Sequence, residues 1–442
     1  MAGRESGGMA AALRCAGRIG ILATVAVNLA WIATYIRRRY FGGGNRSDNN
    51  GGGGEVEPSR GKPPVTSDSI VNLDHGDPTM YEEFWRGTGD SASIFIPGWQ
   101  TMSYFSDLGG ICWFLEPGFE REVRRLHRLV GNAVVDGYHV LVGTGSTQLF
   151  QAVLYALSPA SDGTPMNVVS PAPYYSSYPS VTNYLNSALY RWAGDANTFD
   201  GDTCIELVCS PNNPDGGLRK PVIKSKSSKP VYDFAYYWPQ YTPITEAAAH
   251  DIMLFTVSKC TGHAGTRLGT VVCLRGDACR WALVKDTKVA QKMIKFIELN
   301  TIGVSKDSQL RAAKIIGAIC NGYEPVPSSG KTSQLFHFAK EKMAARWARL
   351  RAAVAASDIF TLPYELSGYC SFSNETVTAN PPFAWLRYNK DDIEDLEAFL
   401  LEKKIITRGG TRFGVDARAV RVSMVDTDQA FNVFINRLAT MK

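Results

Sequence analysis

The sequence lacks the cysteine pattern of a disulfide-stapled or zinc-binding protein. Its 442 residues include nine cysteines, with no CxxC pair and no even framework among them. Scattered cysteines of this kind are typical of reduced thiols in a body that faces the cytosol. We expect no metal site, and no internal repeat is evident, which argues against a repeat architecture.

The body of the chain also lacks an excess of charge of either sign. The whole sequence carries 47 basic and 42 acidic residues, a formal net charge of +5. Residues 1–60 hold eight arginines against four acidic residues, a net of +4, and the other 382 residues hold 39 basic and 38 acidic groups. A nearly neutral body is a poor polyanion binder, so nucleic acid is not an expected partner. With 45% apolar residues the chain has ample material for a globular core.

One long uncharged run is present near the N-terminus. Residues Ile19–Ile36 contain no charged side chain and are flanked by arginines. As a helix they would rise about 27 Å, close to the roughly 30 Å hydrocarbon core of a bilayer. A cleaved signal peptide would end in small residues, and a buried core helix would not be followed by three arginines and a glycine run. We expect residues 1–41 to be a single-pass anchor in the endoplasmic reticulum membrane, with the body in the cytosol. Sequons at Asn45 and Asn374 would matter only in a lumen.

The rest of the chain divides into a tether and two domains. Residues 42–69 are rich in glycine and proline and are typical of a flexible linker. Beyond them, short apolar runs alternate with helix-length segments, which predicts a parallel α/β sheet with ligands at the carboxyl ends of its strands. We expect a large domain over residues 70–330 and a smaller one over 331–442, opened by a helix over roughly 333–356. The strand-like runs are Val140–Val142, Asn167–Ser170, Cys204–Cys209, Val231–Tyr232 and Ile252–Val257.

Polar clusters follow these runs in a definite order. Alone, each has a simple structural explanation as a turn, a helix cap or a solvated lysine. Their order is similar to that of the fold-type I pyridoxal-phosphate enzymes, so together they favour a cofactor site. The clusters are the glycine-rich turn Gly143–Thr147, the pair Tyr174–Tyr175, the turn Asn212–Gly216, Asp233 with Tyr236, and Thr256–Lys259 with Arg267.

Pyridoxal 5′-phosphate chemistry explains the two most reactive residue types. A lysine is needed to bond covalently to the cofactor aldehyde, and Lys259 is the candidate. A carboxylate is needed to keep the pyridine nitrogen protonated so that the ring accepts electrons, and Asp233 is the candidate.

The remaining clusters would hold the cofactor in place. Asn213 and Tyr236 would bind its 3′-oxygen. Tyr175 would cover the ring face, with Tyr174 as the alternative. The candidate phosphate ligands are Ser146, Thr147, Thr256, Ser258 and Arg267.

A closer resemblance runs from about residue 70 to the C-terminus. It rests on the segments HGDPTMYEEFW (75–85), MSYFSD (102–107), CWFLEP (112–117), DFAYYWP (233–239), SKCTGHAG (258–265) and IGVSK (302–306). These segments are similar to the plant alliinase and tryptophan-aminotransferase-related family. Alliinases carry a cysteine-rich module before the catalytic region, whereas residues 42–111 contain no cysteine. The sequence therefore resembles the aminotransferase branch.

That resemblance implies a function and a fold. The branch converts L-tryptophan to indole-3-pyruvate, with pyruvate or another 2-oxo acid as amino acceptor, in auxin synthesis. Other aromatic amino acids stay open as donors, and two alternatives are a C–S lyase on the same cofactor and a catalytically impaired membrane-tethered homologue. The implied fold is that of a fold-type I aminotransferase: a large domain with a mostly parallel sheet flanked by helices, a smaller α/β domain and an N-terminal transmembrane helix.

Two further residues and one departure follow from the family pattern. Arg421 matches the arginine that binds the substrate α-carboxylate, a task suited to a bidentate guanidinium. Tyr104 matches a tyrosine that reaches the cofactor phosphate from the neighbouring subunit in related enzymes, which implies a homodimer. The departure is an eleven-residue insertion, Thr270–Arg280, before the strand-like run Trp281–Val284. Because Thr270–Leu274 is strand-like too, the chain offers that strand twice, and the effect on activity is open.

Overall fold

A computed structural model describes residues 65–159, 163–265, 280–324 and 334–442. The chain divides into two units, Met1–Pro63 and Pro64–Lys442, and all described residues belong to the second. The expected membrane anchor and most of the expected tether lie outside the described residues. No helix in the described ranges combines the length and the apolar character needed to cross a bilayer.

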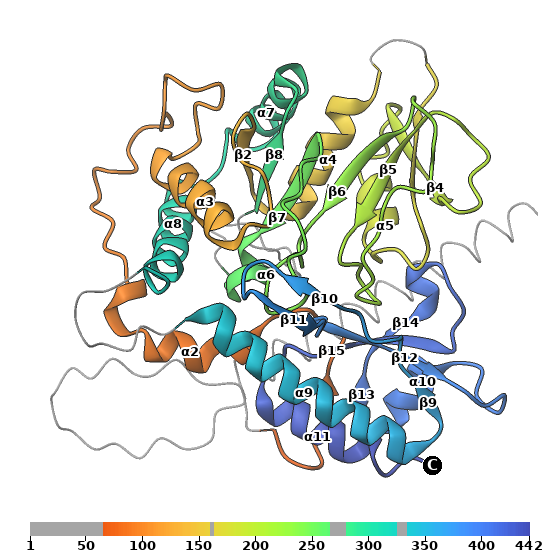
Figure 1. Cartoon of the computed structure of the whole chain (residues 1–442). Coiled ribbons are helices and arrows are strands. Elements are labelled where there is room, and N and C mark those ends of the chain that lie inside the picture. Colours follow the sequence, from red (N-terminus) through yellow and green to blue (C-terminus); the bar gives the residue numbers. More distant parts are fainter. Residues whose placement is uncertain (1–64, 160–162, 266–279, 325–333) are drawn as a thin grey trace, which may run out of the picture. The chain divides into compact units, whose positions relative to one another are not determined.

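A seven-stranded sheet forms the centre of the larger part of the molecule (Figure 1). Its strand order is β2-β8-β7-β6-β5-β3-β4. Strand β8 runs antiparallel to β2 and β7, and the other neighbouring strands are parallel. All five apolar runs that predicted strands lie in this sheet, which confirms a mostly parallel α/β architecture. The strands are β2 His139–Gly143, β3 Met166–Ser170, β4 Tyr190–Asp195, β5 Cys204–Cys209, β6 Lys229–Asp233, β7 Ile252–Thr256 and β8 Arg280–Val284.

Helices cover both faces of this sheet. The Trp281 ring lies 6.2 Å between centroids from the Phe119 ring of α3. Gly143 pairs with Arg280, the neighbour of Trp281, so it points to the other face. There an added Cβ would come within 2.6 Å of Leu149 in α4. Helix α3 packs with α8, and α4 packs with α7, which gives three layers (Figure 1). These helices are α3 Pro117–Val130, α4 Gly145–Leu157, α7 Thr287–Thr301 and α8 Lys306–Asn321.

A four-stranded antiparallel sheet, β14-β15-β12-β9, forms the smaller part. Helices α9 and α11 pack together beside it (Figure 1). The first strand, β1, pairs in parallel with β13, so the start of the described chain is built into this part. The predicted helix over 333–356 corresponds to α9. The elements are β1 Val71–Asn72, α9 Leu335–Ser357, β9 Phe360–Thr361, β12 Phe383–Tyr388, α10 Leu396–Glu402, β13 Ile405–Ile406, β14 Arg408–Gly409, β15 Ala419–Ser423 and α11 Asp428–Leu438.

The sequence sets several helix starts through side-chain caps. The Asp286 side chain accepts a hydrogen bond from the Val289 amide at the start of α7. Ser305 caps α8 and Thr427 caps α11 in the same way. Each cap satisfies a backbone amide that has no partner inside the helix. Loss of such a cap costs about 1 kcal/mol.

The eleven-residue insertion falls mostly on residues that the structure does not describe. Of the two strand-like runs near it, Trp281–Val284 forms β8. The other run, Thr270–Leu274, lies outside the described residues. Strand β8 lies between β7 and β2 in the sheet. The strand at the end of the insertion therefore joins β2 to the rest of the sheet.

A buried histidine, His127, lies between α3 and the sheet. Its Nδ1 is 2.8 Å from Asn132 Oδ1, and Trp281 Nε1 donates to its Nε2 at 2.9 Å. Because Nε2 accepts, the neutral ring carries its proton on Nδ1 and donates to Asn132. Burial lowers the pKa of His127 from 6.5 to about 4, against a smaller opposing effect of the hydrogen bond to Asn132.

We expect His127 to make folding less stable in mild acid. Between pH 6.5 and about 4 the unfolded chain binds more protons than the folded one, so the free energy of unfolding falls as the pH falls. From pH 7.5 to pH 5 this amounts to about 2 kcal/mol. Urea unfolding at both pH values should show that His127→Gln loses about that much less than the wild type. The half-buried His139 gives the control His139→Gln. Equal losses in wild type and His127→Gln would contradict the assignment.

Candidate active site

Several of the predicted site residues follow strands that end at one edge of the large sheet. The last residue of β5, Cys209, pairs with the last residue of β6, Asp233. Strand β7 leads directly into the short helix α6, Val257–Thr261, which carries Lys259. Strand β2 leads into α4 through Gly145, whose φ of +85° favours glycine. All of these strands run in the same direction, and their carboxyl ends form the edge where ligands bind in such sheets.

The carboxylate of Asp233 is buried and held by hydrogen bonds at both oxygens. Its Oδ1 accepts from the Ala235 amide at 3.1 Å, and its Oδ2 accepts from the Tyr178 hydroxyl at 3.2 Å. A buried, hydrogen-bonded carboxylate fits the task of holding a protonated ring nitrogen. Sequence reasoning missed Tyr178, which begins the short helix α5, Tyr178–Asn183.

Lys259 is held from two directions. Its Nζ donates a hydrogen bond to the Gly76 carbonyl oxygen. Its own carbonyl accepts from the Tyr241 hydroxyl at 3.0 Å, and that hydroxyl lies 2.9 Å from the Tyr81 hydroxyl. An added Cβ on Gly76 would lie 3.2 Å from Lys259 Nζ and 2.7 Å from the ring of Phe383. The segment around Gly76 therefore lies beside the Lys259 amine, which the sequence alone did not indicate.

Asn213, Tyr236 and Arg421 form a continuous chain of contacts. Asn213 Nδ2 donates to the Tyr236 hydroxyl at 3.4 Å, and Arg421 Nη1 donates to Asn213 Oδ1 at 3.1 Å. Arg421 Nη2 donates to the Asp74 carbonyl oxygen. The Nε of Arg421 is buried and has no hydrogen-bond partner among the described residues. The structure thus brings together three residues that are far apart in the sequence and that were predicted to share a site.

Arg421 is a buried cation between aromatic rings. Its guanidinium carbon lies 4.1 Å from the Phe383 ring centroid and 5.5 Å from that of Phe413. Burial lowers the pKa of Arg421 to about 10, and the positive charge of Arg408 adds to this effect. In the described part of the chain no carboxylate forms an ion pair with Arg421. A desolvated guanidinium of this kind fits an anionic ligand.

The neighbouring cation, Arg408, is neutralised by a carboxylate. Arg408 donates to both oxygens of Asp74, with Nη2 3.0 Å from Oδ2, and its Nη1 donates to the Ser176 hydroxyl at 3.0 Å. Burial would raise the pKa of Asp74, but the hydrogen bonds from Arg408 and the positive charges of Arg408 and Arg421 together outweigh it, so that the pKa is lowered. Of Arg408 and Arg421, Arg421 is therefore the one suited to a substrate carboxylate.

The structure separates the two candidate tyrosines for the ring face. Tyr175 packs edge-on against Tyr178, with 5.3 Å between ring centroids, and so lies one ring away from Asp233. Tyr174 instead packs against Trp192 at 5.0 Å between ring centroids. This geometry favours Tyr175 as the residue next to a ring held by Asp233.

Four of the five candidate phosphate ligands lie at two helix starts. Thr256 is buried, and its hydroxyl oxygen accepts from the Ser258 amide at 3.1 Å, which caps α6. Thr147 is exposed in the first turn of α4. Ser146 belongs to the same turn, but its side chain lies outside the described residues, as does all of Arg267. The phosphate role of all five stays a prediction.

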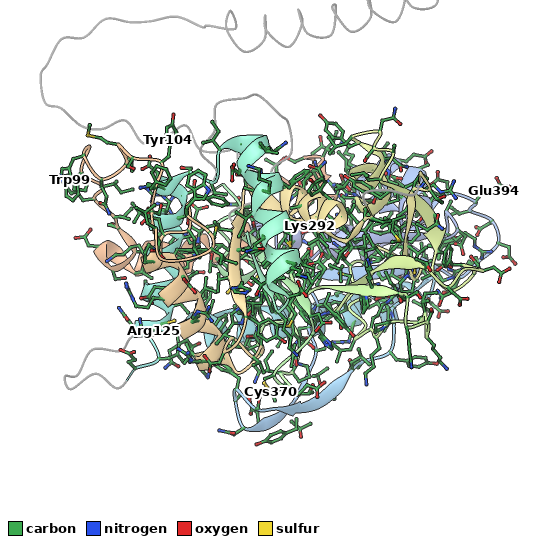
Figure 2. All side chains as sticks on the ribbon, turned by 90° about the horizontal axis from the view of Figure 1, so that it is seen from above. Trp99, Tyr104, Arg125, Lys292, Cys370 and Glu394 are labelled. Atoms are coloured by element: carbon green, nitrogen blue, oxygen red, sulfur yellow. The ribbon has the colours of Figure 1, made fainter. Side chains whose placement is uncertain are left out.

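Tyr104 lies away from the site of its own chain. It is 71% exposed, in a segment from residue 93 to 116 that has no regular helix or strand. Figure 2 shows Tyr104 and Trp99 at the margin of the molecule. Other exposed apolar side chains of the segment are Phe95, Met102, Phe105, Leu108 and Ile111. Its predicted contact with a second copy of the chain stays a prediction.

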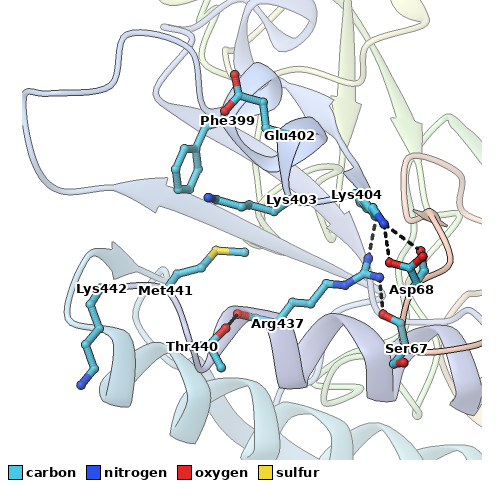
Figure 3. A pocket seen from close by; sticks show the side chains of 10 residues that line it. All are labelled: Ser67, Asp68, Phe399, Glu402, Lys403, Lys404, Arg437, Thr440, Met441 and Lys442. Atoms are coloured by element: carbon cyan, nitrogen blue, oxygen red, sulfur yellow. Dashed lines mark hydrogen bonds and ion pairs between the residues drawn. The ribbon is translucent and has the colours of Figure 1, made fainter.

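A separate hollow of about 610 Å³ contains none of the predicted site residues. It lies between residues 67–68, the end of α10 and the end of α11 (Figure 3). Arg437 donates to the carbonyls of Ser67 and Ser69, and Lys404 pairs with Asp68. These contacts attach the start of the described chain to the smaller part of the molecule. We therefore assign the residues around the hollow a structural role.

The fold is that of the fold-type I aminotransferases. An aminotransferase structure from Staphylococcus aureus superposes with a TM-score of 0.59 at 17% identity, covering 87% of this chain and 96% of that one. The aspartate aminotransferase from Rhizobium meliloti gives 0.57 at 15% identity, covering 84% and 90%. Identities this low show the fold alone.

Sequence comparison places the chain within a family. A family model described as Allinase matches residues 71–442. Tryptophan aminotransferase-related protein 1 of Oryza sativa subsp. japonica is 69% identical over 96% of both chains. Tryptophan aminotransferase-related protein 2 of Arabidopsis thaliana is 50% identical over 84% of this chain and 82% of its own. Alliin lyase 1 of Allium sativum is 33% identical over 83% and 74%. The chain belongs to the alliinase and tryptophan aminotransferase-related family, which confirms the resemblance seen in the sequence.

The residues present fit the cofactor on which this family generally depends, pyridoxal 5′-phosphate. The buried Asp233 carboxylate suits the ring nitrogen, and the Lys259 amine suits the aldehyde. The amide of Asn213 and the hydroxyl of Tyr236 suit the 3′-oxygen. Arg421 is not needed for these cofactor contacts. Its Nε, which has no hydrogen-bond partner among the described residues, is a donor available to the carboxylate of an amino acid.

Proposed function

We propose that this protein transfers the amino group of L-tryptophan to pyruvate or another 2-oxo acid, giving indole-3-pyruvate for auxin synthesis, with pyridoxal 5′-phosphate as cofactor. Phenylalanine and tyrosine are further donors to be compared. The observation that carries the proposal is the buried Arg421, which is linked through Asn213 to Tyr236. The 69% identity to a protein named as tryptophan aminotransferase-related supports the choice of donor.

The residues of the chain have distinct tasks in this reaction. When bound, pyridoxal phosphate supplies an electron sink for the negative charge that develops at the substrate Cα. Arg421 binds and orients the α-carboxylate, and Asn213 Oδ1 accepts a hydrogen bond from its guanidinium. Lys259 Nζ removes the Cα proton as general base. Its side chain is buried at the edge of the sheet where the cofactor residues lie. Asp233 holds the ring nitrogen in its protonated form.

The surroundings of Arg421 also support an aromatic donor. The rings of Phe383 and Phe413 flank the guanidinium, and the Tyr236 ring lies 5.6 Å from that of Phe383 in an edge-on arrangement. These rings exclude water from the carboxylate site and offer apolar surface to an indole side chain. A small polar donor would leave that surface uncovered.

A direct assay separates transamination from the lyase alternative. The alternative is favoured by the 33% identity to alliin lyase 1, and the same cofactor residues would serve it. We expect the purified full chain to convert L-tryptophan and pyruvate to indole-3-pyruvate and alanine. A C–S lyase would instead release ammonia and pyruvate from an S-alkyl cysteine sulfoxide. Lyase products without transamination products, or no turnover by a folded chain that binds the cofactor, would contradict the proposal.

A further inference from the structure

The hydroxyl of Tyr178 makes a buried contact with the carboxylate of Asp233. Tyr178 is 1% exposed and begins the short helix α5, Tyr178–Asn183. Its hydroxyl lies 3.2 Å from Asp233 Oδ2, on the carboxylate oxygen that the Ala235 amide does not bind. The contact joins two segments that are 55 positions apart in the sequence. Tyr178 lies outside the six sequence segments that carry the resemblance to the family.

We propose that Tyr178 is a positioning residue for Asp233, and that its hydroxyl fixes the carboxylate in the orientation that holds the ring nitrogen of pyridoxal phosphate. The inference rests on the proposed function, because Asp233 has this task only if the chain binds that cofactor. Tyr178 does not itself touch the reacting atoms. It acts through the direction in which it points the carboxylate.

Tyr178 keeps its proton and so acts only as a donor toward Asp233. Burial raises the pKa of Tyr178 well above 10, and the negative charge of Asp233 raises it further. The Asp233 carboxylate therefore receives the Tyr178 hydroxyl as a hydrogen-bond donor at any physiological pH.

Packing fixes the ring that carries this hydroxyl. The Tyr178 ring meets Phe150 edge-on at 5.2 Å and Tyr175 edge-on at 5.3 Å between centroids. A buried ring held on two sides has few rotamers, so its hydroxyl points in one direction. The same ring also braces Tyr175, the candidate for covering the cofactor. Tyr178→Phe keeps both ring contacts and removes the hydroxyl alone.

The chain offers a matched control for this change. Tyr232 directly precedes Asp233 in β6, so its side chain points to the opposite face of the sheet. There it stacks on His250, with 3.6 Å between ring centroids. Tyr232→Phe therefore removes a hydroxyl next to Asp233 in sequence without touching the Asp233 carboxylate.

The test measures the affinity of the full chain for pyridoxal phosphate after the cofactor has been removed. Hydrogen bonds to charged groups contribute about 1.5–3 kcal/mol, so we expect Tyr178→Phe to raise the dissociation constant at least tenfold. Tyr232→Phe should change it less than twofold. Circular dichroism and urea unfolding of each variant without cofactor check that the fold is kept. Equal affinities for the Tyr178→Phe and Tyr232→Phe proteins would overturn the inference.

A second measurement separates positioning from a general structural role. In the Asp233→Asn background, Tyr178→Phe should change the dissociation constant less than twofold, because the charge that it orients is gone. A tenfold effect that persists in that background would overturn the inference. Failure of the proposed function is distinguishable, because then the wild-type chain itself would not bind pyridoxal phosphate.

Discussion

Lys259→Ala is expected to lower the rate of amino-group transfer from tryptophan by about four orders of magnitude. A positioned general base contributes about 10² to 10⁴ in rate, and the same amine also bonds to the cofactor. The change should be measured as single-turnover formation of the 2-oxo acid with pyridoxal phosphate in excess. A Lys259→Ala protein that keeps normal turnover would rule out the proposed mechanism.

Two controls make this loss specific to the amine. Lys292 is exposed on α7 (Figure 2), and Lys292→Ala should stay within twofold of the wild type. A small primary amine added to the Lys259→Ala protein should restore part of the rate, since it supplies a base in the space left by the side chain. Rescue by a primary but not by a quaternary amine would show that a free amine, and not a positive charge, is what the variant lacks.

The order of the polar clusters could be predicted from the sequence because each cluster follows a strand. Cys204–Cys209 was predicted as a strand to the residue, and Asp233 and Lys259 lie at the strand ends expected for them. Parallel strands place their carboxyl ends at one edge, so order along the chain translates into proximity in space. This reasoning needs only local patterns, and it predicted Asn213 and Tyr236 as members of the same site.

Residues brought in by other parts of the chain could not be predicted in this way. Asp74 and Gly76 reach the site because β1 pairs with β13, and a two-residue strand leaves no periodic signal. The antiparallel direction of β8 could not be predicted either, because an apolar run has the same sequence pattern in a parallel and in an antiparallel strand. Tyr178 was overlooked because a tyrosine at the start of a short helix has no sequence pattern that separates packing from a hydrogen bond to a distant carboxylate.

Arg421→Gln is expected to lower kcat/KM for tryptophan by about 10² to 10³. Removing one partner of a buried, hydrogen-bonded ion pair costs about 3–5 kcal/mol, and each 1.4 kcal/mol is tenfold. The loss should fall largely on KM, whereas the dissociation constant of pyridoxal phosphate should change little. Arg421→Lys keeps the charge but loses the bidentate geometry, so it should recover only part of the loss. An unchanged KM for tryptophan in the Arg421→Gln protein would contradict the assignment.

A matched arginine and a matched substrate complete this test. Arg387 on β12 is half-exposed and pairs with Asp416 at the surface, so Arg387→Gln should stay within twofold of the wild type. Tryptamine has the indole side chain of tryptophan but no carboxylate, and therefore nothing for Arg421 to bind. The ratio of kcat/KM for tryptophan to that for tryptamine should collapse in Arg421→Gln and stay constant in Arg387→Gln. If both ratios fall together, the effect is on the fold of the small domain, and if neither falls, Arg421 does not bind the carboxylate.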